Sequence, residues 1–587
     1  MAKTPRKNQM NQHGSRIRAG QEARGDGTLL RSYTVGALPI INHILQRMNL
    51  ESILREHLPP DDPRVEVSTV SALLVLVRNM LLSREPIYGI GEWAARYAPD
   101  LLGLTERQLS YLNDDRLGRC LDRLFDTLGP TLLLAVVRHV IREFDVRLDE
   151  LHNDSTSVLV YGAYENASEE KLRRGRKTHA ITYGHSKDHR PDLEQLLYIL
   201  TVSEDGGVPV YFTSASGNTT DDTTHRDTWQ LLCDLVGNAD FLYVADCKLA
   251  TTANMDYIAR RAGRFVTVLP RTRREDGELR RRLRERPQTV AWRTLYVVRD
   301  ENEKIIDTLS SCDLEQTSAE GYRVFWFHGT RKAQLDAEAR SKQTQRALAA
   351  LALLNDRLAG TRTRFRERTK VQQAVDEILV HFGVTNWVTV AIDEDEEAVY
   401  RQASPGRPGE DTKYVKRAKK RFRLTSRIDT LRLIDEAATD GVFPLITNVR
   451  DMDAEAVLRA YKRQPIIEKR FSQLKTDFEV APIYLKEISR IQSLLCVYFL
   501  VLLVQTLLER ELRGGMERAG MASLPFYPEE RACRRPTSRR LFDVFEPLER
   551  HELTFSDGSR ECLTPRLSPL HRQVLGLLCI PVGRYLD

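Results

Sequence analysis

The stretch of sequence that decides the fold runs from Leu196 to Thr213 and reads LLYILTVSEDGGVPVYFT. Two apolar runs, Leu196–Val202 and Val208–Thr213, flank the turn Asp205-Gly206-Gly207. An Asp-Gly pair between two apolar runs is a strong β-hairpin signal, because the turn needs positive φ angles that glycine adopts without strain. The sequence therefore predicts two antiparallel strands in this stretch.

Further strands and helices are expected on both sides of this hairpin. Upstream, Val146–Asn153 and Thr156–Tyr161 (TSVLVY) have the composition of strands. Downstream, the apolar periodicity predicts helices at Thr223–Val236 and Asn254–Arg261, and strands at Phe241–Ala245 and Phe265–Leu269 (FVTVL). Three hairpin-linked strands followed by alternating helices and strands are typical of a mixed α/β sheet.

The pattern changes at several places along the chain, and these changes predict domain boundaries. Residues 31–145 have apolar positions three and four apart, which is typical of helices. Residues 271–440 interrupt the α/β pattern, and Val442–Asn448 (VFPLITN) then returns as an apolar strand. The predicted segments are a flexible basic arm (1–30), an all-α N-terminal domain (31–145), the first part of an α/β core (146–270), an α+β insertion domain (271–440), the second part of the core (441–512) and a small helical C-terminal region (513–587).

The insertion is predicted to be rich in charged helices. Its expected elements are strands at Val290–Val298, Tyr322–Phe327 and Val388–Ile392, helices at Arg331–Leu358 and Arg366–Phe382, and a loop at Ala403–Glu410 (ASPGRPGE).

Composition excludes several classes of protein. The chain has 587 residues, of which 41% are hydrophobic and 29% are charged, and this fits a globular protein better than a disordered one. The net charge of +6 is small for the length and does not by itself indicate nucleic acid. The eight cysteines form no CxxC and no Cys/His cluster, which argues against a zinc ribbon or a disulfide framework.

Membrane and nucleotide partners are not expected. The longest apolar run, Leu494–Leu508, is shorter than the roughly 20 residues that span a bilayer, so we expect a buried core helix there. The first residues contain no apolar stretch, which argues against a signal peptide, and no P-loop is present. The expected location is the cytoplasm.

Two acidic residues follow predicted strands. Asp154 ends the first strand, in LDELHNDSTSV, and Asp246 ends the short strand FLYVA. The carboxyl ends of strands in open α/β sheets are where ligands bind, and two neighbouring carboxylates repel each other unless a cation lies between them. Oxygen-only ligands favour Mg²⁺ or Mn²⁺ over zinc. A capping or turn role for each aspartate stays open at this point.

A third acid lies in a predicted helix. In YKRQPIIEKRFSQLKTDF, an apolar stripe indicates a helix packed on a core, and it carries Glu468 and Lys475. These two residues are seven apart, nearly two helical turns, so we expect them on one face. A carboxylate and a lysine on one face suit a site that holds a phosphate beside metal ions.

Together these residues resemble the DDE transposases of bacterial insertion sequences, which have an RNase H-like core. The order of Asp154, Asp246, a long insertion and Glu468 is similar to theirs. So are the segments GHSKDHRPDL (184–193), GNTTD (217–221) and DGVFPLITN (440–448). The last helix resembles their Y-x₂-R-x₃-E-x₆-K signature, with Tyr461, Glu468 and Lys475 in place. The resemblance covers about 146–512 well and the N-terminal helices more loosely.

Two positions depart from the family pattern. Gln464 stands where the signature has arginine, and Arg463 is one residue away, which points elsewhere on a helix. Pro465 is expected to start or kink the helix, so Tyr461 need not continue the face that carries Glu468.

The resemblance implies an RNase H-like catalytic core that uses two Mg²⁺ ions, for which Mn²⁺ can substitute, held by Asp154, Asp246 and Glu468. It implies cleavage at the ends of an insertion sequence, leaving a 3′-OH, and attack of that 3′-OH on target DNA. The implied partners are double-stranded DNA, as terminal inverted repeats and as target, and a second copy of the chain on paired ends. The implied setting is bacterial and nucleoid-associated.

DNA contacts are expected at basic positions. The resemblance assigns Lys475 to phosphate and Tyr461 to the DNA end, with Arg463 and Gln464 beside them. Three basic stretches are further candidates, the arm at 1–30, the run Arg271–Arg286 and the run KLRRGRK. The cations of the last run are Lys171, Arg173, Arg174, Arg176 and Lys177. Each run can also be a solvated face. The helices of 31–145 are expected to bind DNA ends.

Two alternatives stay open. One is a metal-dependent nuclease on the same core that cuts DNA without joining it. The other is an inactive or domesticated DNA-binding protein of the same fold, although that class predicts the loss of at least one of the three acids, and all three are present.

Overall fold

The computed structural model describes residues 22–23, 29–162, 164, 167–170, 172–300, 303–312, 314, 316–360, 363–478, 480, 483 and 485–586. Most of the predicted arm at 1–30, and Lys171, lie outside the described residues. The chain forms two compact units. Unit 1 comprises Met1–Phe265 and Ala460–Asp587, and unit 2 comprises Val266–Arg459.

Unit 1 contains a mixed β-sheet. Strand β3 (Glu150–Val160) pairs antiparallel with β6 (Glu194–Ser203), and β6 pairs antiparallel with β7 (Pro209–Ser216). On its other side β3 pairs parallel with β8 (Leu242–Ala245). After β7 the chain alternates between helices and strands. The prediction of a mixed α/β fold is confirmed.

The β6–β7 hairpin follows the signal in its sequence. Gly206 and Gly207 have φ angles of 75° and 68°, in the left-handed region that only glycine adopts readily. The Ser203 backbone N–H donates to the Val208 carbonyl at 2.9 Å and closes the turn. The predicted hairpin is confirmed.

The predicted break between two upstream strands is wrong. The structure has the single strand β3, with unbroken pairing to β6 from Leu151 opposite Ser203 to Val160 opposite Glu194. Asp154 therefore lies within the strand and does not end it. The run of polar residues around Asp154 has the composition of a strand end. In the structure, however, these residues belong to the continuous strand β3 and are paired with β6.

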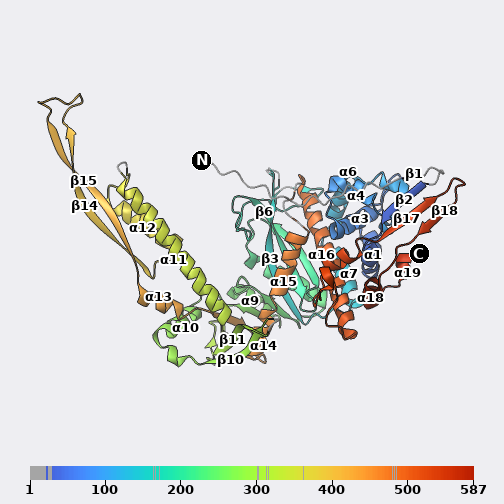
Figure 1. Ribbon diagram of the computed structural model, residues 1–587. Coiled ribbons are helices and arrows are strands. Elements are labelled where there is room, and N and C mark those ends of the chain that lie inside the picture. Colours follow the sequence, from blue (N-terminus) through green and yellow to red (C-terminus); the bar gives the residue numbers. More distant parts are fainter. Residues whose placement is uncertain are drawn as a thin grey trace. The chain divides into compact units, whose positions relative to one another are not determined.

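One long helix forms the centre of unit 1. Helix α16 (Ile488–Arg518) packs against β7 on one side and against α3 (Thr69–Leu82) and α6 (Asp114–Thr127) on others (Figure 1). Its apolar part is long enough to cross a membrane by length and composition, but the whole apolar window is buried inside the protein. The prediction of a buried core helix is confirmed.

The remaining helices of unit 1 precede and follow the sheet. They are α1 (Leu38–Arg47), α2 (Leu50–His57), α4 (Ile90–Ala94), α5 (Glu106–Leu109), α7 (Pro130–Glu143), α8 (His225–Val236), α9 (Thr252–Ala259), α15 (Pro465–Ser472), α17 (Ser538–Phe545), α18 (Pro569–Leu577) and α19 (Gly583–Leu586). Helix α14 (Ala454–Lys462) contains the boundary between the units.

The two ends of the described chain share a small sheet. Its strand order is β1 (Glu22–Ala23), β2 (Leu29–Thr34), β17 (Glu549–Thr554) and β18 (Arg560–Leu563). Because β2 reaches Thr34, the prediction of an all-α N-terminal domain is not confirmed, and the prediction of a helical C-terminal region is wrong at β17 and β18. These short polar strands lack a clear apolar alternation, and pairing across distant segments creates them.

The strands of unit 2 pair antiparallel with one another. The strand order is β10 (Trp292–Arg299), β11 (Ile305–Cys312), β13 (Arg323–Gly329), β16 (Val442–Thr447) and β9 (Arg264–Val268), and β12 (Gln316–Thr317) pairs with β13. Helix α10 (Arg274–Glu285) contains most of the basic run Arg271–Arg286.

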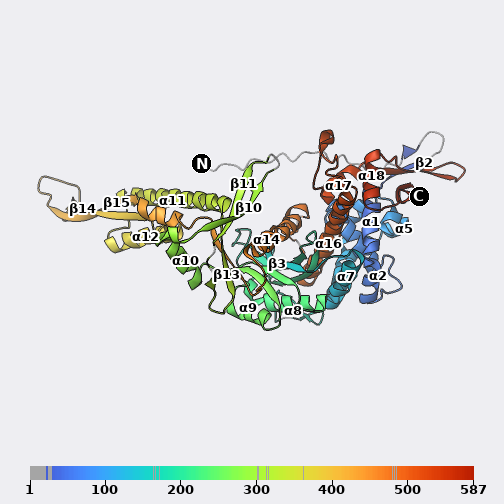
Figure 2. The same ribbon diagram turned by 90° about the horizontal axis from the view of Figure 1, so that it is seen from below.

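Two long helices and a two-stranded ribbon complete unit 2 (Figure 2). Helix α11 (Thr330–Ala359) packs on β15 (Tyr414–Ile428), and α12 (Arg368–His381) packs on β14 (Val388–Gln402); α13 (Thr430–Ala437) follows. The predicted strand at 388–392 was ten residues too short, and β15 was not predicted. Both strands are dominated by charged residues, so an apolar pattern could not reveal them.

Candidate active site

Asp154 and Asp246 come from the two parallel strands of unit 1. The register of β3 and β8 pairs Leu151 with Tyr243 and His152 with Val244. Continuing this register by two residues places Asp154 beside Asp246, and the side-chain period of two puts both on the same face of the sheet. The structure therefore brings the two aspartates together, although Asp154 sits inside its strand.

A lysine ammonium occupies the space beside these acids. Lys187 Nζ donates to Asp154 Oδ1 at 3.1 Å, to the Ser155 carbonyl at 2.6 Å and to Ser155 Oγ at 3.0 Å. It also forms an ion pair with Asp221 Oδ2 at 3.3 Å, and Asp221 Oδ1 accepts from Ser155 Oγ at 2.7 Å. Asp154, Asp221 and Lys187 thus form a connected cluster that is mostly shielded from solvent.

The pKa values of Asp154, Asp246 and Lys187 are all raised, and for related reasons. Burial raises the pKa of Asp154, and the charge of Asp246 adds to this while Lys187 opposes it. Burial also raises the pKa of Asp246, and the charge of Asp221 adds to it. Burial alone would lower the pKa of Lys187, but the carboxylates of Asp154 and Asp221 outweigh this and raise it. The charged forms of Asp154 and Asp246 are therefore disfavoured overall, and the Lys187 ammonium offsets this only in part.

The third predicted acid, Glu468, comes from a helix. It lies in the first turn of α15 with its side chain exposed. Tyr461, at the end of α14, has a pKa raised to about 12, first by burial and then by the charges of Asp246, Cys247, Glu468 and Asp154. The charges of all three predicted acids thus add to the burial that raises the pKa of this phenol.

The break between the two helices falls where the proline predicted it. Helix α14 ends at Lys462, and α15 begins with Pro465 as its first residue. The expectation that Pro465 starts a helix is confirmed. Tyr461 and Glu468 lie on different helices, so the signature spacing does not correspond to a single helical face.

A buried arginine fixes the position of α15. Arg470 donates from Nε to the Gly207 carbonyl at 2.9 Å and from an Nη to the Gly206 carbonyl at 2.6 Å, so the helix is tied to the β6–β7 turn. Its other Nη donates to Gln473 Oε1 at 2.5 Å and reaches Glu509 Oε2 of α16 at 3.4 Å. Glu468 lies two residues before Arg470 in the same helix.

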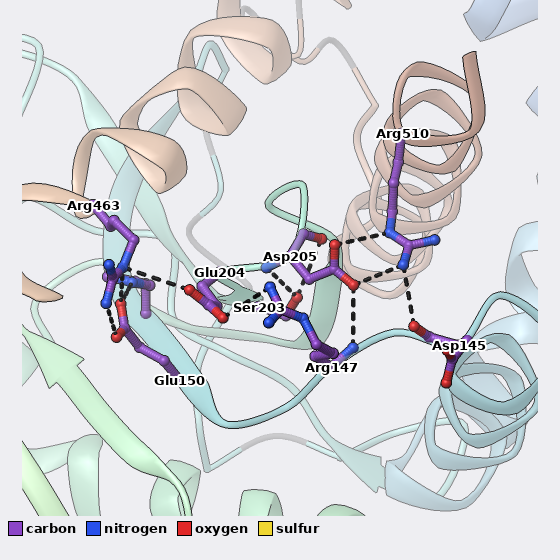
Figure 3. Close-up of polar contacts among 9 residues, drawn as sticks. Asp145, Arg147, Glu150, Ser203, Glu204, Asp205, Arg463 and Arg510 are labelled. Atoms are coloured by element: carbon purple, nitrogen blue, oxygen red, sulfur yellow. Dashed lines mark hydrogen bonds and ion pairs between the residues drawn. The ribbon is translucent and has the colours of Figure 1, made fainter. Parts of the chain in front are cut away.

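Arg463 and Gln464 have partners inside unit 1. Arg463 Nε donates to Glu150 Oε1 at 2.6 Å and lies 3.6 Å from Glu204 Oε2 (Figure 3). Gln464 is buried; its Oε1 lies 2.8 Å from His152 Nδ1, and its Nε2 donates to the Asn153 carbonyl at 3.2 Å. The burial of Gln464 argues against the predicted DNA contact there, because its amide already binds β3. A DNA contact by Arg463 stays a prediction.

Further ion pairs hold the base of the sheet next to Arg463. Arg510 of α16 donates to Asp205 Oδ2 at 2.7 Å and to the Asp145 carbonyl at 3.1 Å (Figure 3). Arg147 Nη2 lies 3.2 Å from Glu204 Oε1. These contacts join the start of β3, the β6–β7 turn and α16, which are the elements that position the cluster.

Lys475 lies in a π-helical turn, Gln473–Asp477, directly after α15. The expectation that Lys475 and Glu468 share one face of a continuous α-helix is therefore wrong, because the helix widens between them. Lys475 Nζ donates to Asp188 Oδ1 at 2.6 Å, and Asp188 follows Lys187 in the chain. Lys475 is thus linked to the segment that supplies the ammonium of the cluster.

The basic run at 171–177 is partly used for internal contacts. Arg174 Nε donates to Asp126 Oδ1 at 2.6 Å, and Arg176 donates to the Phe125 and Asp126 carbonyls at 2.8 and 3.0 Å. These contacts tie the short hairpin of β4 (Leu172–Arg173) and β5 (Arg176–Lys177) to the end of α6. The DNA contacts predicted for Arg173, Arg174, Arg176 and Lys177 stay predictions.

The side chains of the site have the donor atoms that a divalent metal ion prefers, but they are not arranged around one common point. Within the described part of the chain, no group of three or more His, Cys, Asp or Glu side chains is arranged to hold a metal ion. The donor set is nevertheless all oxygen, which suits Mg²⁺ or Mn²⁺. The Lys187 ammonium, bonded to Asp154 and Asp221, stands in for a cation at this position.

Sequence reasoning did not assign roles to Lys187, Asp221 or Arg470. Lys187 and Asp221 lie in the segments GHSKDHRPDL and GNTTD, which were noted only for their resemblance. The sequence thus marked both segments, but it could not show which acid Lys187 contacts, because that depends on how the loop folds. Arg470 carried no signal, because a lone arginine in a charged helix is usually exposed.

Comparisons with known proteins give the following similarities. A family model described as a domain of unknown function (DUF4277) matches residues 30–138, which cover α1 to α6 and part of α7. No curated protein matches the chain. Among solved structures, the chain is similar to a piggyBac transposase synaptic complex with hairpin DNA, with 9% identity and a TM-score of 0.32, over 86% of this chain and 77% of that chain. It is also similar to a Mos1 transposase paired-end complex with the left transposon end, with 9% identity and a TM-score of 0.13, over 34% of this chain and 59% of that chain.

Proposed function

We propose that this chain is a DDE-type DNA transposase with an RNase H-like catalytic core. It would cut DNA at the ends of an insertion sequence and join the 3′-OH ends to target DNA. One observation carries the proposal. Asp154 on β3 and Asp246 directly after β8 are neighbours in the register of the two parallel strands, and with Glu468 on α15 they add to the burial that raises the pKa of Tyr461. These three carboxylates come from two strands and a helix, and in the proposal they act together.

Asp154, Asp246 and Glu468 are the residues that would hold Mg²⁺, or Mn²⁺ in its place. When bound, such ions supply Lewis acidity to a phosphodiester and lower the pKa of water. The raised pKa values of Asp154 and Asp246 support this assignment, because a cation relieves the repulsion and the burial that raise them. Lys187 would leave Asp154 when the ion arrives.

The other residues of the site would bind and orient DNA. With a pKa of about 12, Tyr461 keeps its proton at neutral pH, so its hydroxyl can donate a hydrogen bond to a phosphate oxygen. Lys475 and the displaced Lys187 are cations that would contact phosphate near the cut. Cleavage and joining are both in-line displacements at phosphorus, so one arrangement of these groups serves both steps.

The proposal extends to partners and domains. Double-stranded DNA, as inverted repeats and as target, and a second copy of the chain would be the partners, without a nucleotide cofactor. Residues 31–145 and the arm at 1–30 would contribute to binding the DNA ends. Residues 146–270 and 441–512 would form the catalytic core around the insertion 271–440.

The test is cleavage of a linear DNA that carries the sequences flanking the gene, in the presence of Mg²⁺. Asp154→Asn, Asp246→Asn and Glu468→Gln should each abolish cleavage while leaving DNA binding largely intact. Asp240→Asn is the matched control, because Asp240 is an exposed aspartate of unit 1 that pairs only with Arg264 among the contacts described. Retained cleavage in Asp154→Asn would reject the assignment.

A strand-transfer assay with precut ends separates the proposal from its alternatives. A transposase joins the 3′-OH ends to a second DNA. Cleavage without joining would identify a metal-dependent nuclease, and DNA binding without either reaction would identify an inactive DNA-binding protein of the same fold.

A further inference from the structure

The ribbon formed by β14 and β15 is divided into two parts by its charges. All five acids of β14, Asp393–Glu397, lie opposite residues 419–423 of β15. Lys420 pairs with Glu394, and Arg421 Nε pairs with Glu397 at 2.8 Å. The middle of the ribbon is therefore stabilised by opposite charges across the strands.

The distal part of the ribbon has no such balance. Residues 398–418 contain five cations and two acids, and both acids, Glu410 and Asp411, lie in the tip loop. Opposite Arg417 and Lys416 stand Val399 and Tyr400. Among the described residues, Arg401, Lys413, Lys416 and Arg417 have no ion-pair partner.

The distal part also lies beyond the core that supports the ribbon. The core of this region contains Ile392, Phe422 and Leu424 and residues of α11 and α12, but no residue between 393 and 421. Arg421 donates to the Ala359 carbonyl at 2.9 Å, which marks the end of α11. Figures 1 and 2 both show the hairpin continuing past the ends of α11 and α12. Five further residues on each strand, 398–402 and 414–418, extend about 17 Å at the usual rise of a β-strand.

Large side chains on this projection are exposed. Tyr400 is 62% exposed, Tyr414 is 53% exposed and Val415 is 48% exposed. A two-stranded ribbon without a supporting layer is at best marginally stable in water, so a partner that covers it would stabilise it.

The distribution of charge over the two faces indicates the shape of that partner. Arg401 and Arg417 lie on one face of the ribbon, and Lys416 lies on the other with Tyr400 and Tyr414, because paired residues share a face. A flat protein or membrane surface would meet only one face. The major groove of DNA is about 12 Å wide, admits a two-stranded ribbon and presents phosphates on both sides of it.

We propose that residues 398–418 form a DNA-binding arm that enters the major groove of duplex DNA. Arg401, Lys413, Lys416 and Arg417 contact phosphates on the two sides of the groove. The choice of DNA as ligand rests on the proposed function, but the binding itself needs neither the carboxylates nor the cleavage reaction.

The test measures binding of the full chain to a random-sequence duplex by fluorescence anisotropy, with EDTA present so that no cleavage occurs. The variant R401Q/K413Q/K416Q/R417Q should bind at least tenfold more weakly. The slope of log affinity against log salt should fall by roughly three to four, since each lost phosphate contact removes about 0.9. The matched control K342Q/R346Q/R357Q/R366Q removes three exposed cations of α11 and one of the segment between α11 and α12, and it should bind as the parent does.

A second variant removes the arm without touching its supporting core. Replacing 398–418 by Asn-Gly joins Glu397 to Lys419, which are paired, through a two-residue turn. It should lose affinity at least as strongly as the quadruple variant. Parental affinity and salt dependence in both variants would overturn the inference. So would a changed oligomeric state in sedimentation with unchanged DNA affinity, which would make the arm a contact between copies, or a loss confined to binding of anionic phosphatidylserine vesicles.

Failure of the arm and failure of the proposed function are distinguishable. Asp154→Asn should bind the duplex as the parent does if the arm is correct, whether or not the parent cleaves DNA. A parent that binds through the arm but never cleaves would overturn the proposed function alone. A parent that cleaves while arm variants bind normally would overturn the arm alone.

Discussion

At the scale of single residues, the cluster around Asp154 is governed by the placement of charge. Two aspartates predicted from strand ends are neighbours in register, and Lys187, which was not assigned a role, is bonded to one of them. Ser155 connects Asp154 to Asp221 through its backbone N–H and its hydroxyl. A site that concentrates carboxylates in this way is stable only while a cation is near, whether an ammonium or a metal ion.

Asp154→Asn should stabilise the chain at neutral pH in the absence of metal. The pKa of Asp154 is raised in the folded state above the ordinary value of 3.8, so its ionisation destabilises the fold as pH rises through the folded pKa. Removing the charge should raise Tm at pH 7 by about 1–3 °C. The gain should shrink as pH falls toward 3.8, where the parent is protonated as well. Calorimetry of both chains across pH checks this, and a lower Tm for the variant at pH 7 would contradict it.

Lys187→Gln should increase the stabilisation that Mg²⁺ gives. The substitution removes the ammonium bonded to Asp154 and Asp221, so Tm without metal should fall, and an added divalent ion no longer has to displace a lysine. The Mg²⁺-induced rise in Tm should therefore exceed that of the parent. Lys177→Gln, at an exposed position of β5, is the control. An unchanged response to Mg²⁺ in Lys187→Gln would show that the ammonium and the ion do not compete.

At the scale of elements, the packing of α15 determines the position of Glu468. Pro465 starts the helix, and Arg470 ties it to the β6–β7 turn and to Glu509 of α16. Gly207 is required in that turn, because a Cβ there would lie 2.5 Å from the Ile466 side chain, apart from the strain of its positive φ. The hairpin that decides the fold thus also forms the surface on which the helix of the third acid rests.

Arg470→Met should destabilise unit 1 strongly. It removes one partner of a buried charge pair and leaves Glu509, which is 1% exposed, with only Lys469 and Arg513 as cationic neighbours. Breaking a buried pair from one side costs about 3–5 kcal/mol. Lys469→Gln is the matched control, since Lys469 lies 3.6 Å from the same carboxylate but is 45% exposed, and it should cost under about 1 kcal/mol. Denaturant unfolding measures both, and equal losses would contradict the role given to Arg470.

At the scale of the whole molecule, the chain builds two cores. In unit 1 the core is organised around α16, and in unit 2 a separate cluster joins α11 and α12 to the base of the β14–β15 ribbon. The helices of this second cluster contribute Leu351 and Val375, and the strands contribute Ile392 and Phe422. Each unit can therefore lose stability through its own core.

Leu351→Ala and Leu502→Ala should act on different thermal transitions. Leu351 is 2% exposed in α11 of unit 2, and Leu502 is fully buried in α16 of unit 1. Each truncation leaves a cavity and should cost about 2–5 kcal/mol. Calorimetry should show Leu351→Ala lowering the transition of unit 2 and Leu502→Ala lowering that of unit 1. If both variants shift one common transition equally, the two units unfold as one.

The sequence by itself determined the elements whose signals are local. The Asp-Gly-Gly turn predicted the β6–β7 hairpin, the apolar run at 494–508 predicted the buried α16, and Pro465 predicted the start of α15. The positions of Asp246 after β8 and of the long charged helices of the insertion also followed from short-range patterns. Such features need only the dihedral preferences and the hydrophobicity of neighbouring residues.

Only the tertiary structure decided the features that depend on distant partners. Whether Asp154 ended a strand or lay inside one depended on pairing with β6, and the charged ribbon β14–β15 exists because acids on one strand face cations on the other. Two side chains join residues that are far apart in the chain. Lys187 binds Asp154, and Arg470 of α15 binds the β6–β7 turn. Interactions between charges depend on their distance and burial in space, and these are properties of the folded chain that no local pattern contains.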